Sequence, residues 1–286
     1  MEARPRPSWQ VDLKWVAGIF ACVAILISGV IFSLNEITER GRAEPLSSVF
    51  IAFLIDGRVT DEEFEAVQAQ AAADPSGPVS LSPLDVELPG SEIAGLEREE
   101  ASLIFAARFT AVLYDEGPEA AEALILEPGP NEDGEPQEAI DLGPTSSLTG
   151  SQHSTVRTIF LASLAIVLVL LGPVAFLSRG LGRLGAPAVV VALSAAPLAA
   201  FWSLAGNAVG TPGEDEELYA VIGRGLIRDM AGDLRDFFLA IFGIALAWAV
   251  IAFVGTLLTP LSRRLGRKVA AALQKAPQPD APSPSA

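Results

Sequence analysis

The residue types that most often carry catalysis and metal binding are scarce in this sequence. It holds one cysteine, Cys22, which lies inside an apolar run, and one histidine, His153. A single cysteine cannot form an intrachain disulfide or a cysteine cluster around a metal, and a single histidine cannot supply the several imidazoles typical of zinc sites. Neither a G-x-S-x-G motif nor a glycine-rich phosphate loop is present. We therefore predict no catalytic residues and no cofactor, and enzymatic activity is less favoured than its absence.

Charge is also missing from four long segments. The chain has 286 residues, half of them hydrophobic, yet carries a net charge of −16, so apolar and charged residues are segregated along it. A helix of about 20 residues crosses the ~30 Å hydrocarbon core of a bilayer. Four runs of this length contain no Asp, Glu, Lys, Arg or His, which predicts membrane-spanning helices at 15–34, 158–177, 186–206 and 237–258.

The first of these runs has to be distinguished from a cleaved signal peptide. Its apolar stretch is longer than the hydrophobic region of a typical signal peptide, and no A-x-A-like site follows it. Residues Ile19–Cys22 partly match a lipoprotein cleavage box, but Phe20 is too bulky for that motif. We therefore predict an uncleaved membrane anchor.

Basic and acidic residues alternate between the segments that join the predicted spans. Residues 1–14, 178–185 and 259–286 together contain ten basic and three acidic residues. Residues 35–157 contain 25 acidic and 6 basic residues, and the loop 207–236 contains 7 acidic and 3 basic residues. Because cytoplasmic loops are enriched in Lys and Arg, both termini and the hairpin 178–185 are predicted to be cytoplasmic. The excess of arginine over lysine, with abundant Ala, Gly and Pro, favours a bacterial protein of the plasma (inner) membrane.

The acidic segment 35–157 contains enough apolar sequence to fold as an extracytoplasmic domain. Leu103–Tyr114 is apolar nearly all round and too short to span a membrane, which predicts a buried core helix. Val49–Ile55 is a second apolar block that we expect to pack against it. Arg108 is the only charge in the core helix, and we expect it to pair with a carboxylate of the domain. The acidic, Pro- and Gly-containing residues 127–150 predict a stem before the second span.

Smaller elements are predicted between these two apolar blocks. Asp61–Ala73 is typical of an amphipathic helix, and Thr60 with Glu63 forms a capping box at its start. Val79–Leu81 and Val86–Leu88 are candidate short strands in a segment rich in Pro, Ser and Gly. The domain is therefore expected to be mainly helical with a minor β contribution.

A further helix is predicted in the loop 207–236. Apolar residues from Tyr219 to Phe237 recur at spacings of three and four and form one stripe, with several arginines on the opposite face. This helix has two interpretations: it lies on the outer membrane surface, or it covers the apolar underside of the outer domain with its arginines meeting acidic residues. The second interpretation is slightly favoured.

Asp56 and Glu63 are candidate metal ligands, and the acidic run 131–135 is a second, weaker candidate that is more often simply solvated. Asp56 and Glu63 stand where positions 5 and 12 of an EF-hand calcium loop would fall, and Gly57 occupies position 6. Calcium also needs oxygen ligands at positions 1 and 3, which are Ala52 and Leu54 here. A turn followed by a capped helix explains the same pattern without a metal.

The sequence therefore predicts an all-α membrane protein: a four-helix transmembrane bundle with an outer domain inserted between the first two spans. The leading functional hypothesis is a non-catalytic envelope protein that presents its acidic domain to another membrane or envelope protein or to cations. An alternative is a metal-dependent or carboxylate-based enzyme in the outer domain, since some of the 25 acidic residues can converge in space. A channel or transporter subunit is the third hypothesis, disfavoured because the spans lack charge. The lipid bilayer is an expected partner of the chain, and nucleic acid is not.

Overall fold

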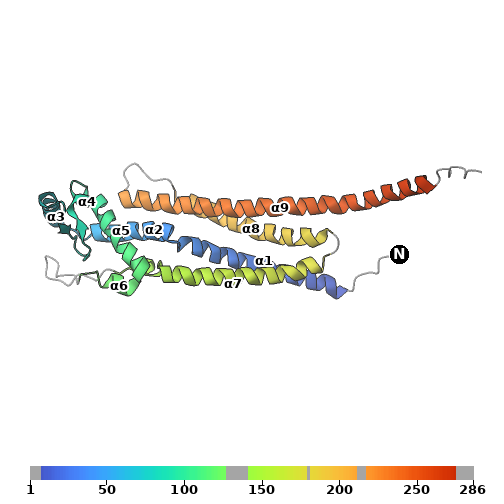
Figure 1. Cartoon of the computed structure of the whole chain (residues 1–286), viewed down its shortest axis with the longest axis horizontal. Helices are drawn as coiled ribbons and strands as arrows, with labels where there is room; N and C mark the ends of the chain where they lie inside the picture. The colour runs from blue at the N-terminus through green and yellow to red at the C-terminus, as the bar shows by residue number, and fades with distance from the viewer. Residues whose placement is uncertain (1–7, 127–140, 179–180, 211–216, 275–286) are drawn as a thin grey trace, which may run out of the picture. The chain divides into compact units, whose positions relative to one another are not determined.

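A computed structural model describes residues 8–126, 141–178, 181–210 and 217–274 of the chain (Figure 1). The described residues are helical except for one pair of two-residue strands and the connecting segments. The elements in chain order are α1 (Ser8–Ile37), α2 (Arg40–Asp56), α3 (Asp61–Ala73), β1 (Pro78–Val79), β2 (Leu88–Pro89), α4 (Gly90–Ile93), α5 (Arg98–Glu116), α6 (Pro118–Glu122), the 3-10 helix η1 (Gly143–Ser147), α7 (Gly150–Phe176), α8 (Gly182–Ala208) and α9 (Leu218–Gln274).

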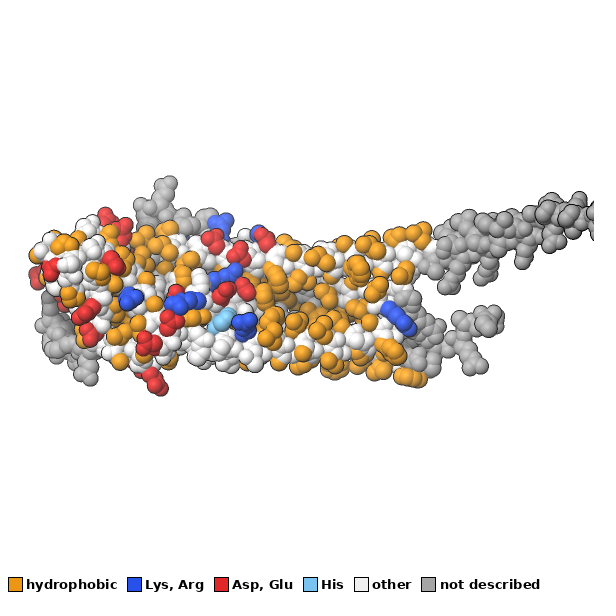
Figure 2. All heavy atoms as spheres, viewed as in Figure 1, with side chains coloured by type: hydrophobic (Ala, Val, Ile, Leu, Met, Phe, Trp, Pro, Cys, Tyr) orange, Lys and Arg blue, Asp and Glu red, His pale blue; other side chains and the backbone are white. Residues whose placement is uncertain are grey.

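Four of these helices are long and apolar enough to cross a membrane. The candidate spans are Asp12–Ile37, Gly150–Phe176, Gly182–Ala208 and Leu218–Leu258, each of which contains a long apolar stretch. Large apolar side chains on them are exposed, for example Val169 and Ile244 at 72% each, and Figure 2 shows hydrophobic side chains covering their visible surface. Exposed apolar area on this scale is unfavourable in water and favourable in lipid, so the fold is that of an all-helical protein consistent with membrane insertion.

Two of the spanning helices extend well beyond the predicted spans. α7 begins at Gly150, so the last part of the segment predicted as a stem contains the 3-10 helix η1 and ends at the first residue of α7, while residues 127–140 lie outside the described residues. α9 is continuous through the predicted outer helix, the predicted span at 237–258 and part of the predicted tail. The stripe that starts at Tyr219 leads directly into the apolar run without a turn signal, so a single helix satisfies both patterns.

The described chain divides into two compact units. Unit 1 comprises Met1–Ile25, Ile166–Ala196 and Ala240–Ala286. Its apolar cluster forms around Ala21 of α1, Val174 of α7 and Val190 of α8. Small residues allow this close packing, since lipid offers no hydrophobic driving force for helix association and contact area has to replace it.

Unit 2 comprises Leu26–Ala165 and Pro197–Leu239 and contains the other parts of the long helices. Phe32 of α1 stacks on Phe237 of α9 at 4.4 Å between ring centroids and contacts Phe160 of α7 at 5.4 Å. The indole Nε1 of Trp202 on α8 donates to Ser33 Oγ of α1 at 3.1 Å. Within this unit, contacts therefore join all four long helices.

The helices between α1 and α7, which we call the inserted domain, surround a hydrophobic core within unit 2. The core contains Ile51 and Ile55 of α2 with Phe105, Phe109 and Leu113 of α5, all of them at most 1% exposed. This confirms the predicted core helix and its contact with the apolar block Val49–Ile55. Both elements are longer than predicted because helix α2 starts at Arg40 and helix α5 at Arg98.

The smaller elements follow local sequence signals. The capping box of α3 is present: Thr60 Oγ1 accepts from the Glu63 backbone N–H at 3.2 Å, and Glu63 Oε2 accepts from the Thr60 N–H at 3.0 Å. Two short strands also form, but they pair Pro78 with Pro89 and Val79 with Leu88, so each is displaced from its predicted range. The predicted ranges place Leu81 and Val86 in strands, whereas both side chains are buried in the core from the loop between β1 and β2.

The start of α9 covers the core of the inserted domain, which agrees with the second of the two interpretations of this helix. Tyr219 is 4% exposed and belongs to the core cluster, and its hydroxyl donates to the Glu99 carbonyl at 3.3 Å. The prediction had arginines of this helix meeting carboxylates of the domain. One ion pair has the opposite arrangement, since Arg42 of α2 pairs with Asp233 of α9 at 3.2 Å.

Candidate functional site

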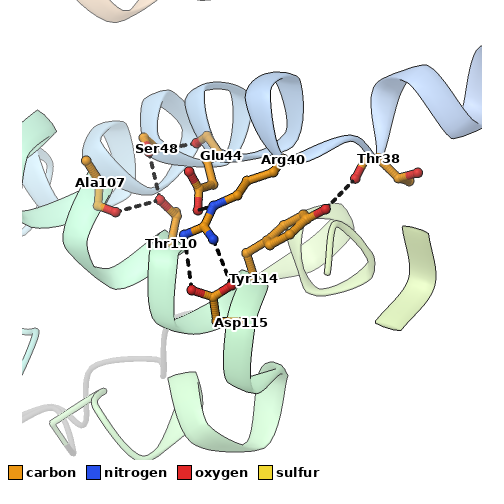
Figure 3. A network of polar contacts seen from close by, with 8 residues as sticks. All are labelled: Thr38, Arg40, Glu44, Ser48, Ala107, Thr110, Tyr114 and Asp115. Carbon is orange, nitrogen blue, oxygen red and sulfur yellow. Dashed lines mark hydrogen bonds and ion pairs between the residues drawn. The ribbon is translucent and has the colours of Figure 1, made fainter. Parts of the chain in front are cut away.

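The densest group of polar contacts in the inserted domain centres on Arg40, at the start of α2 (Figure 3). Its Nε lies 2.8 Å from Glu44, and its two terminal nitrogens donate to Asp115 of α5 at 3.0 and 3.1 Å. The negative charge of Glu44, and then that of Asp115, raises the pKa of Arg40. The guanidinium also lies over the Tyr114 ring at 5.7 Å. These contacts fasten the start of α2 to the end of α5.

Two hydroxyl groups extend this group into the core. Ser48 Oγ and Thr110 Oγ1 lie 2.8 Å apart, and both residues are buried. Each hydroxyl also lies within hydrogen-bond distance of a carbonyl of its own helix, Ser48 of Glu44 at 2.7 Å and Thr110 of Ala107 at 3.1 Å. Because a hydroxyl has one proton, one of the two donates to its helix carbonyl while the other donates across the contact. Both hydroxyls are thus satisfied within the fold, as expected for buried polar groups in a packed core.

The single histidine is part of the same region. His153 Nδ1 on α7 lies 3.2 Å from Thr38 Oγ1, just after the end of α1, and the Thr38 carbonyl accepts a hydrogen bond from the Tyr114 hydroxyl at 3.2 Å. Burial raises the pKa of Tyr114. The contacts of His153 are those of a structural residue, so the cluster ties α1, α5 and α7 together.

The two candidate metal ligands are engaged elsewhere. Asp56 accepts from Arg98 Nε at 2.9 Å, and the same arginine donates to Asp61 at 2.7 Å. Glu63 caps its own helix, as described above. Among the described residues, no group of three or more His, Cys, Asp or Glu side chains is arranged to hold a metal ion.

Arg108 does not follow the prediction made for it. It lies on an exposed face of α5, and no carboxylate of the described residues forms an ion pair with it. Residues 101–113 bury one face of α5 only, so the guanidinium reaches water without crossing the core.

A groove that the sequence analysis did not predict lies between α8 and α9, within unit 2. Its volume is about 540 Å³. The residues that line it are Trp202, Ser203, Gly206, Asn207, Arg228, Asp229, Ala231, Gly232, Asp233, Arg235 and Asp236. Arg228 and Arg235 belong to the predicted polar face of this helix, but spacing along one helix does not show which other element lies opposite that face.

Many carboxylates of the inserted domain point to solvent without a cationic partner among the described residues. On α3, Glu62 and Glu65 are exposed, and they form no ion pair with a described residue. The same holds for Asp85, Glu87 and Glu92 in the segment that follows. Acidic side chains are spread over this domain in Figure 2.

Comparison of the chain with protein families, with curated proteins and with solved structures gives no match.

Proposed function

We propose that this chain is a non-catalytic, multi-pass protein of the bacterial plasma (inner) membrane whose acidic inserted domain docks to a basic surface of another membrane or envelope protein. In this proposal the four apolar helices form a transmembrane bundle. Both termini are cytoplasmic, and the inserted domain is extracytoplasmic. The observation that carries the proposal is the set of carboxylates of this domain that are exposed and form no ion pair with a described residue.

The orientation is supported by the distribution of basic residues. The segments assigned to the cytoplasm hold ten of the 19 Lys and Arg residues but only three of the 35 acidic ones. Lys and Arg near the ends of spans set orientation because they are retained on the cytoplasmic side and attracted to anionic lipid.

The docking role is supported by a difference between the charged residues of the domain: some pair with one another inside the fold, and others do not. Arg40, Arg42 and Arg98 are paired with carboxylates that fasten helices to one another. Among the described residues, the carboxylates that remain unpaired include those on the exposed face of α3 and in the segment from β1 to α4. Such a surface attracts a basic partner at long range, and the attraction weakens as salt rises.

Affinity purification of the full-length protein in mild detergent tests the docking role. We expect a partner to be recovered at low salt and lost at high salt. The double variant Glu62→Lys with Glu65→Lys is expected to lose it, whereas the matched control Glu119→Lys with Glu122→Lys, on α6, retains it. Recovery of the chain alone at low salt contradicts the proposal.

Cation binding at the same surface is tested by calcium titration of the melting temperature. A cation bound only by the folded state raises the melting temperature as its concentration increases. The variant Glu63→Gln keeps an acceptor oxygen for the Thr60 N–H, so it separates a capping role from a ligand role. A calcium-dependent rise that Glu63→Gln abolishes assigns Glu63 as a ligand, and an unchanged melting temperature removes calcium binding.

A further inference from the structure

The groove between α8 and α9 carries both signs of charge at the ends of two membrane-spanning helices. Gly206, which packs against Ala231, closes the span predicted at 186–206, and Asp236 immediately precedes the span predicted at 237–258. The groove is therefore at the level where a bilayer changes from hydrocarbon to headgroups. Trp202, whose indole lines the groove, is a residue type enriched at that level.

An apolar side chain beside the groove is available for contact with lipid chains. Leu239 lies one turn beyond Arg235 and Asp236 on the same face of α9 and is 48% exposed. A molecule bound in the groove thus meets charged groups at one end and an apolar helix surface at the other. This matches a phospholipid, which has a charged headgroup at one end and apolar acyl chains at the other.

The charges in the groove are not equally engaged. Asp233 is paired with Arg42 at 3.2 Å, and Arg235 with Asp236 at 2.8 Å. Arg228 and Asp229 form no ion pair with any described residue, although both are exposed into the groove. Within the described part of the chain, a cation and an anion thus remain available next to each other on the same turn of α9.

We propose that this groove binds the headgroup of a zwitterionic phospholipid that carries a primary amine. Arg228 pairs with the phosphate, because a guanidinium donates two hydrogen bonds to a phosphate in a fixed geometry. Asp229 accepts hydrogen bonds from the ammonium group. The aspartates disfavour an anionic headgroup that lacks an amine, and a trimethylammonium headgroup has no N–H to donate. A volume of about 540 Å³ is within the ~300–1,000 Å³ of small-molecule sites.

A larger side chain in place of Gly232 can fill the groove without disturbing the fold. Gly232 lines the groove, and a Cβ added to it meets no atom within 4 Å. Gly225, also on α9, meets nothing within 4 Å either but does not line the groove. The same substitution at the two glycines therefore separates occupancy of the groove from any general effect on α9.

Native mass spectrometry of the delipidated full-length protein in detergent tests the proposal. The probes are phosphatidylethanolamine, phosphatidylcholine and phosphatidylglycerol with identical acyl chains, together with soluble phosphoethanolamine. Phosphatidylethanolamine is expected to bind most tightly. Gly232→Leu is expected to weaken its binding about tenfold, the loss expected when charge-assisted hydrogen bonds are removed, and Gly225→Leu to leave it unchanged.

Two exposed residues supply variants that do not depend on filling the groove. Asp229→Asn is expected to abolish the preference for phosphatidylethanolamine over phosphatidylcholine, and Arg228→Gln to weaken both lipids. Equal binding of the three lipids to the wild type, or unchanged binding in Gly232→Leu, overturns the proposal. Soluble phosphoethanolamine binding as tightly as the lipid overturns the assignment to a lipid.

This inference rests on the membrane insertion contained in the proposed function, and its failure is separable. Lipid selectivity is measured on the purified chain without any protein partner. Loss of the partner with selectivity retained contradicts only the docking role, whereas loss of selectivity with the partner retained contradicts only the groove.

Discussion

Gly90 is buried where α4 begins against the end of α3. A Cβ placed on it meets the Asp74 carbonyl oxygen at 2.8 Å and the Ala71 Cα at 2.9 Å, both of them backbone atoms. Backbone cannot move aside as a flexible side chain can, so the glycine is required by the closeness of the two helices.

We predict that Gly90→Ala lowers the free energy of unfolding by about 1–3 kcal/mol, the usual cost of overpacking. Thermal unfolding of the full-length protein in detergent measures it. Gly41→Ala on α2 is the matched control, because the added Cβ there meets no atom within 4 Å. A Gly90→Ala protein as stable as the control contradicts the packing of α4 on α3.

Asp74 ends α3 and organises the turn that follows. Its Oδ1 accepts from the Ser76 hydroxyl at 3.0 Å, from the Ser76 N–H at 3.2 Å and from the Gly77 N–H at 3.0 Å. The hydrogen bonds from Ser76, and then that from Gly77, lower the pKa of Asp74. The ionised carboxylate is therefore the form that favours the folded state.

A lowered pKa gives a stabilisation that is present above the pKa of the unfolded state and lost as pH falls through the folded value. We predict that wild type is more stable than Asp74→Asn at pH 7 and that the difference begins to shrink as pH falls below about 4, the unfolded-state value, toward the lower folded one. Melting temperatures measured from pH 3 to pH 7 test this. Asp85→Asn is the control, since the Asp85 side chain makes no hydrogen bond with a described residue. A difference between wild type and Asp74→Asn that does not change with pH contradicts the role of the charge.

At the scale of elements, helix α3 shows how far local signals determine structure. Thr60 and Glu63 lie three residues apart, and that spacing alone predicted the capping box that the structure contains. A cap depends only on neighbouring residues, so its chemistry is readable without knowledge of the fold.

We predict that Thr60→Ala lowers the free energy of unfolding by about 1 kcal/mol, the typical cost of losing an N-cap side chain. Thr60→Ser, which keeps the hydroxyl, is expected to stay near the wild-type value. Denaturation of the full-length protein in detergent measures both. An equal loss in the two variants means that the methyl group of Thr60, rather than the cap, is responsible.

Elements that depend on distant residues were predicted less well. The apolar runs were sufficient to find the long helices and the core helix α5, because hydrophobic periodicity and length report burial directly. The continuity of α9 from Leu218 to Gln274 was not predicted, because nothing in the sequence marks where a surface helix becomes a span. The groove and the Arg40–Asp115 contact join residues on different elements, so sequence spacing carries no sign of them.

At the scale of the whole molecule, the distribution of charge along the chain decides which orientation in the membrane is favoured. Four apolar helices that each cross a bilayer once place both ends of the chain on one side. In the proposed topology the basic ends and the basic hairpin 178–185 share that side, and the acidic segment 35–157 occupies the other. Exchanging the sides puts 25 carboxylates of that segment in the compartment with the anionic leaflet surface, which repels them.

Single cysteines introduced after Cys22→Ala test this arrangement directly. Ala69→Cys, on the exposed face of α3, is expected to react with a membrane-impermeant maleimide in intact spheroplasts. Arg183→Cys in the hairpin and Ser283→Cys in the tail are expected to react only after permeabilisation, because the bilayer core excludes a charged reagent. Labelling of position 183 or 283 from outside reverses the orientation and places the acidic domain in the cytoplasm. In that case its unpaired carboxylates face cytoplasmic proteins, and the groove between α8 and α9 binds lipid of the inner leaflet.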